Sequence, residues 1–433
     1  MFSRIEKIIS ILAILFIIFS SFIPFAFAEE KVKITYLTWM WPAREKLFKQ
    51  TVANFQKKYP NIEVEGIFVS DSAECRQKLL TMIAGGTPPD IAHLWTTDVE
   101  KFYRSGVVLC LDPYIKRDKF PIYDLPPVKD PFLYRGKVYG LPCDGGAFVD
   151  RAIYYNVDLF KAAGLSLLKW DYKHPEATWT WQDFLQIAQK LTKDTNGDGK
   201  IDQFGFNNSI DSFPIYVWSN GGELFRKDMK KCLLDQPAAY EAIQWFANLR
   251  VKYNVMPRPE QVAGAGDLFI TGRIAMENGA YMRAQAYRDA KVPFEFRLAP
   301  YPSGENGLIN LAMAHPNVIL SGSKHPEEAW QFLKYTLSPE NQHNQVLIWR
   351  GYPALTKSMA YSKEYLYPEY PPYDYGPLVF GKARALPKYP AWPEIWDTIM
   401  SGLDPVFLGK ISAKEAVSNF VPKVNEILLK TKE

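Results

Sequence analysis

The chain has 433 residues, of which 47% are hydrophobic, and its formal net charge is +4 at pH 7. A chain of this length can bury a large core and is expected to form two domains. The weak net charge argues against a nucleic-acid partner. The four cysteines lack the spacing of a metal site, and they leave open up to two disulfides or free thiols. They are Cys75, Cys110, Cys143 and Cys232.

Residues 1–28 have the pattern of a secretory signal peptide. Arg4 and Lys7 precede a nearly unbroken apolar run, which ends in Ala-Phe-Ala before two glutamates. An uncleaved membrane anchor is the alternative, because the run is long enough to span a bilayer. Pro24 and the small-x-small site favour cleavage after Ala28. No cysteine lies at this site, so we expect an exported protein without a lipid anchor.

The mature chain opens with a β-α-β pattern. Alternating apolar residues predict strands at 31–39 and 61–69, and apolar residues three to four apart predict a helix over 44–58 between them. Strands joined in this way lie parallel, with a right-handed crossover. A helix at 73–84 and a short strand within 90–95 follow. The pattern therefore indicates an α/β sheet.

The later part of the chain is more helical. Residues 180–183 form a capping box at the start of one helix, and 237–250 predicts another. Pro326 suits the first turn of a helix, and residues 412–415 form a second capping box that opens a C-terminal helix. The Pro- and Tyr-rich stretch 368–396 is too aromatic for a disordered linker, so we expect a packed loop.

No sequence motif indicates catalysis. The five histidines are scattered, and H-E-x-x-H, G-x-S-x-G and the phosphate-binding loop are all absent from the sequence. Carboxylates are plentiful, so a glycosidase pair remains open as an alternative.

The stretch "DTNGDGKID" has the spacing of an EF-hand-type calcium loop. Alternate oxygens would converge on the ion, and Gly199 stands where such loops turn sharply. Position 12 is Gly205, so the usual bidentate glutamate is missing. The alternative is a plain Asn-Gly and Asp-Gly turn after a helix. The expected ligands of a structural calcium are the side chains of Asp194, Asn196, Asp198 and Asp202 and the backbone carbonyl of Lys200.

Aromatic residues make up 15% of the chain, with 12 Trp and 25 Tyr. Many stand in loop-like contexts beside glycine or polar residues. A sugar ring has an apolar face that suits an aromatic plane, and a rim of hydroxyls that suits carboxylates, amides and guanidinium groups. The set therefore favours a sugar ligand, and its size favours an oligosaccharide over a monosaccharide.

Several segments, spread over nearly the whole mature chain, resemble those of one known family. They are, in order, ITYLTW, YPNIEVE, AGGTPPDI, YGLPCDGGAFVDRAIYYNVDLFKAAGL, TWTWQDFLQIAQKL, LFITGRIAMENGA, APYPSG and HPEEAWQFLKYTLSPENQ. In these segments the chain is similar to the extracellular solute-binding proteins of ABC importers, specifically the carbohydrate-binding group that includes maltose-binding proteins. Lipid-anchored members carry a cysteine at the cleavage site. This chain does not, which implies a free periplasmic protein.

The resemblance implies an α/β fold of two lobes joined by a hinge, the type II-like clamshell of periplasmic binding proteins. The chain would cross between the lobes three times, near 142–147, 262–267 and 309–315. The expected lobes are 29–142 with 265–312, and 143–264 with 313–433. The lobes would close on the ligand by rotation.

The resemblance also implies a binding protein that is not an enzyme and acts as a monomer. It would hold a sugar in the cleft between the lobes and deliver it to the transmembrane subunits of an ABC permease. No cofactor would be required, apart from the calcium considered above. The alternatives are a glycerol phosphate, peptide or other polar solute in the same fold, or a secreted carbohydrate-active enzyme.

The resemblance places the ligand at the carboxyl ends of the strands, where open α/β sheets bind ligands. The residues that it implies as ligand contacts are Trp39, Trp41, Asp71, Trp95, Asp144, Trp218, Asn220, Asn278, Tyr281, Arg350, Tyr352 and Arg384.

Overall fold

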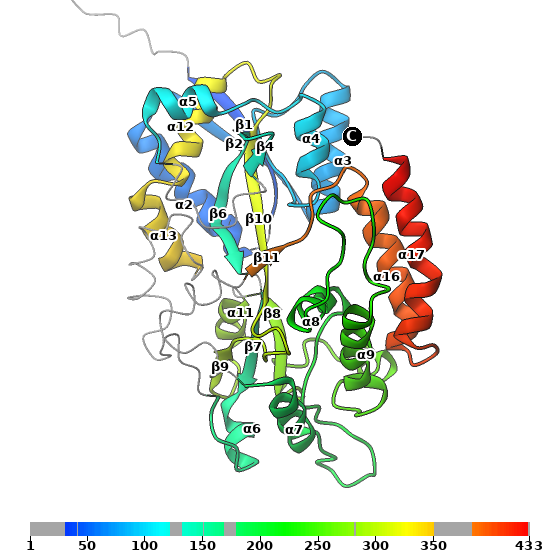
Figure 1. Cartoon of the computed structure of the whole chain (residues 1–433). Coiled ribbons are helices and arrows are strands. Elements are labelled where there is room, and N and C mark those ends of the chain that lie inside the picture. Colours follow the sequence, from blue (N-terminus) through cyan, green and yellow to red (C-terminus); the bar gives the residue numbers. More distant parts are fainter. Residues whose placement is uncertain are drawn as a thin grey trace, which may run out of the picture.

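The computed structural model describes residues 31–40, 42–121, 132–149, 151–168, 179–280, 283–349 and 383–431. The described helices and strands form two lobes, one above the other in Figure 1, and two long strands run between them. These strands are β6 (Leu141–Val149) and β10 (Asn310–Ile319). No described helix is both long and apolar enough to cross a membrane.

The first lobe is built on a sheet with the strand order β11-β10-β3-β1-β2, to which β6 adds by pairing with β10. Strands β1 and β2 lie parallel and are joined by α2, so the predicted β-α-β unit is confirmed. Strand β3 is parallel to β1 and antiparallel to β10. The elements of this lobe are β1 (Val32–Trp39), α2 (Pro42–Lys58), β2 (Ile62–Val69), α3 (Ser72–Ala84), β3 (Ile91–His93), α4 (Val99–Arg104), α5 (Asp112–Asp118), β4 (Leu133–Tyr134), β5 (Lys137–Val138), α12 (Pro326–Thr336) and α13 (Pro339–Trp349).

Strand β1 shows why this sheet is covered on both faces. Successive side chains of a strand point to opposite faces. Ile34 and Tyr36 belong to one hydrophobic cluster, together with residues of α2 and α12. Leu37 and Trp39 belong to a second cluster, which includes residues of α3 and α4. Two covered faces are typical of parallel sheets with crossover helices.

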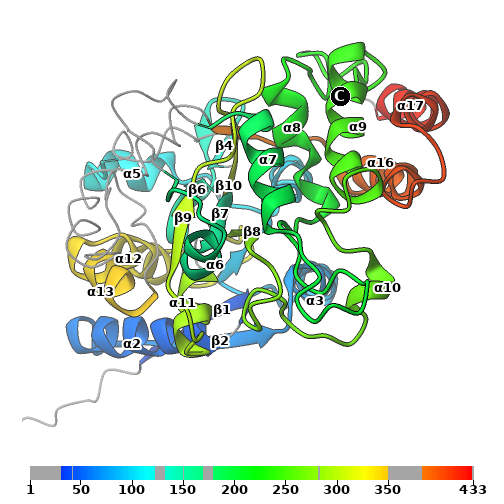
Figure 2. The ribbon, with the colours of Figure 1, turned by 90° about the horizontal axis from the view of Figure 1, so that it is seen from below.

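The second lobe contains a smaller antiparallel sheet with the order β8-β7-β9. Helices cover it and pack around the largest hydrophobic cluster of the described chain. Figure 2 shows α16 and α17 beside α9, on the side away from α2, α12 and α13. The elements of this lobe are β7 (Arg151–Asn156), α6 (Val157–Ala162), α7 (Trp181–Leu191), η4 (Ile210–Ser212), α8 (Phe213–Ser219), α9 (Pro237–Val251), α10 (Pro259–Val262), β8 (Met276–Ala280), α11 (Arg283–Asp289), β9 (Phe296–Ala299), α16 (Trp392–Phe407) and α17 (Ala413–Lys430).

The two long strands are antiparallel partners along the passage between the lobes. Their register runs from Ala312↔Val149 to Asn317↔Leu141, and it shifts between Ala314 and Pro316. A shift of this kind bends the strand and increases its twist locally. The short strand β11 (Ala383–Ala385) lies parallel to the beginning of β10. The expected crossings at 142–147 and 309–315 fall on these two strands.

The expected lobe boundaries need correction. Residues 268–296, assigned to the first lobe from the sequence, pack with β7 instead, because β8 and β9 are its partners in the sheet. Helix α12, assigned to the second lobe, packs on the first lobe's sheet. The crossing expected at 262–267 is wrong as well, since Val262 and Ala265 pack against the second lobe. The chain instead passes from α13 to α16 after residue 349, by way of β11.

Local signals fixed several helix ends as expected. In the capping box of α7, the Thr180 hydroxyl accepts from the Asp183 backbone N–H at 3.2 Å, and the Asp183 carboxylate accepts from the Thr180 N–H at 2.8 Å. Ser412 caps α17 by accepting from the Glu415 N–H at 3.2 Å, which is one half of the predicted capping box. Most of the predicted loop 368–396 lies outside the described residues.

Three cysteines are free thiols, namely Cys75, Cys110 and Cys232, and the side chain of Cys143 is not among those described. Burial raises the pKa of Cys75 and of Cys232 to about 12, so both stay protonated at neutral pH.

Asp118, the last residue of α5, ties this helix to α12. Its carboxylate accepts from Arg117 Nε at 2.8 Å, from Trp330 Nε1 at 2.8 Å and from the Lys334 ammonium group. Hydrogen bonds from Arg117, Lys334 and Trp330 hold the pKa of Asp118 well below its usual range.

Replacing Asp118 with Asn should lower the free energy of unfolding by about 1 kcal/mol at neutral pH, because three donors lose a charged acceptor at a partly exposed site. A depressed folded-state pKa stabilises above the unfolded-state pKa, and this stabilisation is lost as the pH falls through the folded-state pKa. Urea unfolding of D118N and wild type should therefore converge on acidification below about pH 4. Glu426→Gln, which removes an exposed pair with Lys430, is the control and should change stability less. A gap that widens in acid would contradict the prediction.

Candidate functional site

Four aromatic rings gather where β1 and β3 end and β10 crosses them. Trp39 stacks on His93 with ring centroids 3.8 Å apart and planes 10° from parallel. Trp95 stacks on His315 at 4.1 Å and 21°. The two tryptophans are 5.8 Å apart, so the stacks form one cluster. Trp39 is 7% exposed and Trp95 is half-buried, so Trp95 offers more surface to a ligand.

A buried arginine holds two members of this cluster through hydrogen bonds. Arg44 is 1% exposed; its Nη1 donates to the Trp39 carbonyl at 3.0 Å, and its Nη2 lies 2.7 Å from His93 Nδ1. A guanidinium group only donates, so Nδ1 of His93 accepts and its ring proton is on Nε2. That Nε2 is buried and has no hydrogen-bond partner among the described residues.

Both histidines of the cluster are neutral at physiological pH. Burial, with the nearby charge of Arg44 and the neighbouring His315, holds the pKa of His93 well below its usual range. Burial, followed by the charge of Arg44, lowers the pKa of His315 to about 3. The first-lobe wall of the site is therefore formed by aromatic rings, and its two histidines are uncharged.

The second lobe contributes a polar cluster around the start of β7. Arg151 forms an ion pair with Asp211 of η4 at 3.0 Å. Asn278, on the neighbouring strand β8, donates to Ser212 Oγ at 3.2 Å and accepts from the Tyr301 hydroxyl. Asn278 is 6% exposed, so its amide also serves to fix the surrounding groups.

Contacts across the hinge hold these two walls in relation to each other. Trp95 packs against hydrophobic clusters of both lobes. The buried Asn310 of β10 donates to the Arg151 carbonyl at 2.7 Å. A rotation of the lobes would therefore change the contacts of Trp95 and Arg151.

Two residues predicted as ligand contacts, Trp218 and Arg384, lie together. Arg384 of β11 forms a two-point ion pair with Glu223, at 3.0 and 2.5 Å, and its guanidinium group stands 4.7 Å from the centre of the Trp218 ring. They line a cavity of about 500 Å³. Trp218 is only 2% exposed, so its main role here is to support Arg384.

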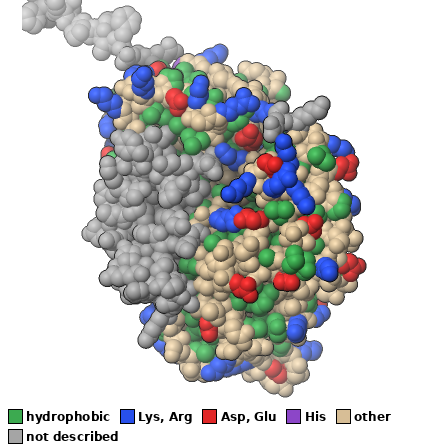
Figure 3. Space-filling model, in the orientation of Figure 1, with side chains coloured by type: hydrophobic (Ala, Val, Ile, Leu, Met, Phe, Trp, Pro, Cys, Tyr) green, Lys and Arg blue, Asp and Glu red, His purple; other side chains and the backbone are tan. Residues whose placement is uncertain are grey.

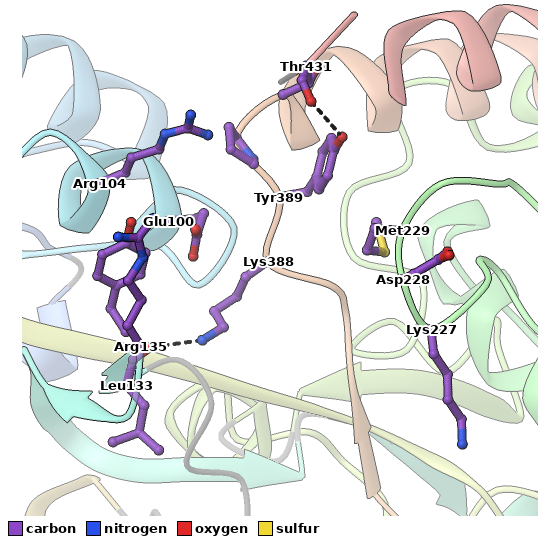
Figure 4. A pocket seen from close by; sticks show the side chains of 12 residues that line it. Glu100, Arg104, Leu133, Arg135, Lys227, Asp228, Met229, Lys388, Tyr389 and Thr431 are labelled. Carbon is purple, nitrogen blue, oxygen red and sulfur yellow. Dashed lines mark hydrogen bonds between the residues drawn. The ribbon is translucent and has the colours of Figure 1, made fainter. Parts of the chain in front are cut away.

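A neighbouring crevice of about 430 Å³ separates the lobes (Figure 4). Its lining comes from α4, the β4 hairpin, the loop 227–229 and the segment 388–390. The Lys388 ammonium group crosses the crevice and donates to the Leu133 carbonyl at 2.9 Å. Figure 3 shows Lys and Arg side chains gathered on this face.

The remaining predicted site residues are placed differently. Asp71 is exposed and caps α3 by accepting from the Glu74 N–H at 2.9 Å. Asn220 lies on another face of the second lobe, beside α9. Asp144 is on β6, but its side chain is not described. Trp41, Tyr281, Arg350 and Tyr352 lie outside the described residues. The ligand-contact assignments stay predictions.

Seven members of the two walls are not identified from the sequence. They are Arg44, His93, Arg151, Asp211, Ser212, Tyr301 and His315. His93 and His315 are distant in the chain, and only the β3–β10 pairing brings them together. Arg44 lies in an ordinary helical pattern, and its signal was its place just after an aromatic strand end.

The carboxylate oxygens of the calcium-like loop accept hydrogen bonds from the loop itself. The Asp194 carboxylate accepts from the N–H groups of Gly197 and Gly199, each at 2.7 Å. Asp202 accepts from the Thr195 N–H and hydroxyl at 2.9 and 2.7 Å. No three His, Cys, Asp or Glu side chains of the described chain come together as a metal site.

Position 12 of this loop also has a structural reason to be glycine. A Cβ added at Gly205 would lie 2.0 Å from the Ala188 carbonyl oxygen of α7, so no side chain fits there. The bidentate glutamate of an EF-hand is therefore excluded at this position by packing. The arrangement described gives no assembled site, and the bound calcium stays a prediction.

Residues 41–343 match the model of the bacterial extracellular solute-binding protein family, and the protein belongs to this family. A putative binding protein of Brucella abortus is 27% identical over 368 residues, which cover 82% of this chain and 83% of the relative. The predicted resemblance is therefore confirmed.

Solved structures share the architecture. An ABC substrate-binding protein from Listeria monocytogenes, in complex with cycloalternan, superposes with a TM-score of 0.80 at 24% identity and covers 92% of this chain and 99% of its own. The sugar-binding protein MalE from Xanthomonas citri gives a TM-score of 0.76 at 22% identity, covering 92% of this chain and 98% of its own. The predicted two-lobed α/β fold is confirmed.

Replacing Arg44 with Met should lower the free energy of unfolding by about 2 kcal/mol, because the Trp39 carbonyl and His93 Nδ1 lose buried donors. Arg44→Lys should recover part of the loss, since an ammonium group can serve one acceptor but lacks the planar fork. Thermal melting of the two variants beside wild type measures the effect. If R44M melts like wild type, the arginine does not organise the cluster.

Calcium occupancy is tested on chelator-treated protein dialysed into calcium. Binding to the folded loop should raise the melting temperature, and Asp194→Ala should abolish the rise. Magnesium at the same concentration is the control, because it demands a tighter octahedral site. If the protein retains no calcium and its melting temperature does not change, the loop is a plain turn and the calcium prediction is wrong.

Proposed function

We propose that the protein is the substrate-binding component of an ABC importer that captures a neutral sugar, preferentially an oligosaccharide, between its two lobes. The observation that carries the proposal is the pair of tryptophan–histidine stacks at the ends of β1 and β3. An indole plane suits the apolar face of a sugar ring, and neutral imidazoles can hydrogen-bond to its hydroxyls.

The charges of the site support a neutral ligand over a phosphate or another anion. His93 and His315 carry no charge at neutral pH, because their pKa values are depressed. Arg151 and Arg384 are each paired with a carboxylate. An anionic solute would need cationic side chains free to face it. At the tryptophan–histidine wall, the glycerol-phosphate alternative is therefore the weaker one.

The relatives support the same class of ligand. Two solved structures of similar fold are named for bound sugars: a Thermotoga lettingae solute-binding protein with α-D-tagatose and a Bdellovibrio bacteriovorus maltodextrin-binding domain with maltotriose. For this chain we infer binding and release without chemical change, outside the cytoplasmic membrane, after removal of residues 1–28. The lobes would close on the sugar and present it to the permease subunits.

A thermal-shift screen with mono- and oligosaccharides tests the ligand class, because a ligand that binds the folded state raises the melting temperature, and the rise grows with the ratio of ligand concentration to Kd. A complete lack of shifts would defeat the sugar assignment. Incubation of the protein with the same sugars, followed by chromatography, addresses the enzyme alternative. Cleavage products would overturn the proposal of a pure binding protein.

Replacing Trp95 with Ala should weaken affinity for the sugar found in this screen by about tenfold, because one stacking surface is lost. Titration calorimetry measures the change. Tyr114→Ala, in α5 at the end of the first lobe away from the second, is the aromatic control and should bind like wild type. Equal affinity of W95A and wild type would place Trp95 outside the site.

A further inference from the structure

We propose a second binding site for a neutral sugar, on the second lobe and outside the hinge cleft. It is an open depression of about 490 Å³ between α7, α9 and the loop 303–305. It is lined by Thr180, Trp181, Gln182, Asn220, Glu241, Trp245, Ser303, Gly304 and Glu305. None of these residues belongs to the tryptophan–histidine stacks, so this site is independent of the ligand of the cleft.

An aromatic platform forms one part of the depression. Trp181, the first residue of α7, stacks on Trp245 of α9 with ring centroids 4.3 Å apart and planes 24° from parallel. Both indoles are half-buried, and both lie against the buried Tyr216. The pair is thus held by the core while part of it remains open to solvent. Such a supported indole surface suits the apolar face of a pyranose.

The polar rim has the chemistry of hydroxyl recognition. Glu241, Glu305 and Gln182 are exposed side chains around the platform. Carboxylates accept strong hydrogen bonds from hydroxyl groups. Among the residues that line the depression, none is Lys, Arg or His. The rim therefore favours neutral sugars and repels phosphorylated or carboxylated ones.

Backbone hydrogen bonds fix the shape of the depression before any ligand arrives. The Trp181 N–H donates to the Ser303 carbonyl at 3.1 Å, and the Gly304 N–H donates to Ser219 Oγ at 2.8 Å. The Asn220 amide donates to the Ala238 carbonyl at 2.9 Å, which orients it. A preformed site loses little conformational entropy on binding. Asn220, which was predicted as a sugar contact in the cleft, lines this depression instead.

The test follows the indole N–H signals of Trp181 and Trp245 by NMR during titration with maltotriose, mannotriose and cellotriose, one at a time. Substitution of each tryptophan by Phe assigns the signals. At least one sugar should shift both signals in a saturable way, in wild type and in Trp95→Ala. The double variant E241Q/E305Q should weaken this binding by about tenfold, because neutral amides replace the charged acceptors.

Glu63→Gln, an exposed carboxylate of the first lobe, is the matched control and should titrate like wild type. Melting of each variant checks that it is folded. No shift of either signal with any of the three sugars would overturn the second site, whatever binds in the cleft. Shifts whose apparent affinity falls in W95A together with the affinity of the cleft would also overturn it, because they would report closure. Shifts that persist when no sugar binds the cleft would support this site and defeat the proposed cleft ligand.

Discussion

One pair of antiparallel strands sets the relation between the two halves of this protein. Strands β6 and β10 are paired from Leu141↔Asn317 to Val149↔Ala312, and each belongs to the first sheet at one end and leads into the second lobe at the other. Backbone hydrogen bonds along this passage keep the strands in register, so relative motion of the lobes must be absorbed where that register breaks. Side chains that flank this strand pair are therefore positioned by both lobes.

Burial and one enclosed cation set the electrostatics of the first-lobe wall. Arg44 is enclosed by the ends of β1 and β3, and burial, followed by the charge of Arg44, suppresses protonation of the two nearby histidines. A protonated histidine would place a second cation within the same enclosed space. The protein therefore presents uncharged rings at the ends of β1 and β3, and Arg151 and Arg384 each face a carboxylate. This arrangement is the basis of the proposed preference for a neutral polar ligand.

Sequence reasoning succeeded where local pattern decides the structure. Alternation in β1 and β2, the apolar spacing of α2 and the capping box of α7 depend on neighbours a few residues away. It failed where distant pairing decides. Strands β8 and β9 pair with β7, so residues 268–296 belong to the second lobe and not, as expected from the sequence, to the first. No local sequence pattern indicates this pairing. The same limit applies to the site: the family resemblance implies Trp39 and Trp95 at strand ends, whereas His315 reaches Trp95 only through the β3–β10 pairing.

His315 stands at the point where β10 loses its register with β6, between Ala314 and Pro316. Its ring stacks on Trp95, which is carried by the segment after β3. Rotation at the break would change the overlap of these two rings before it altered the rest of either lobe. Because an indole's emission depends on what lies against its face, the emission of Trp95 is expected to change with the hinge angle.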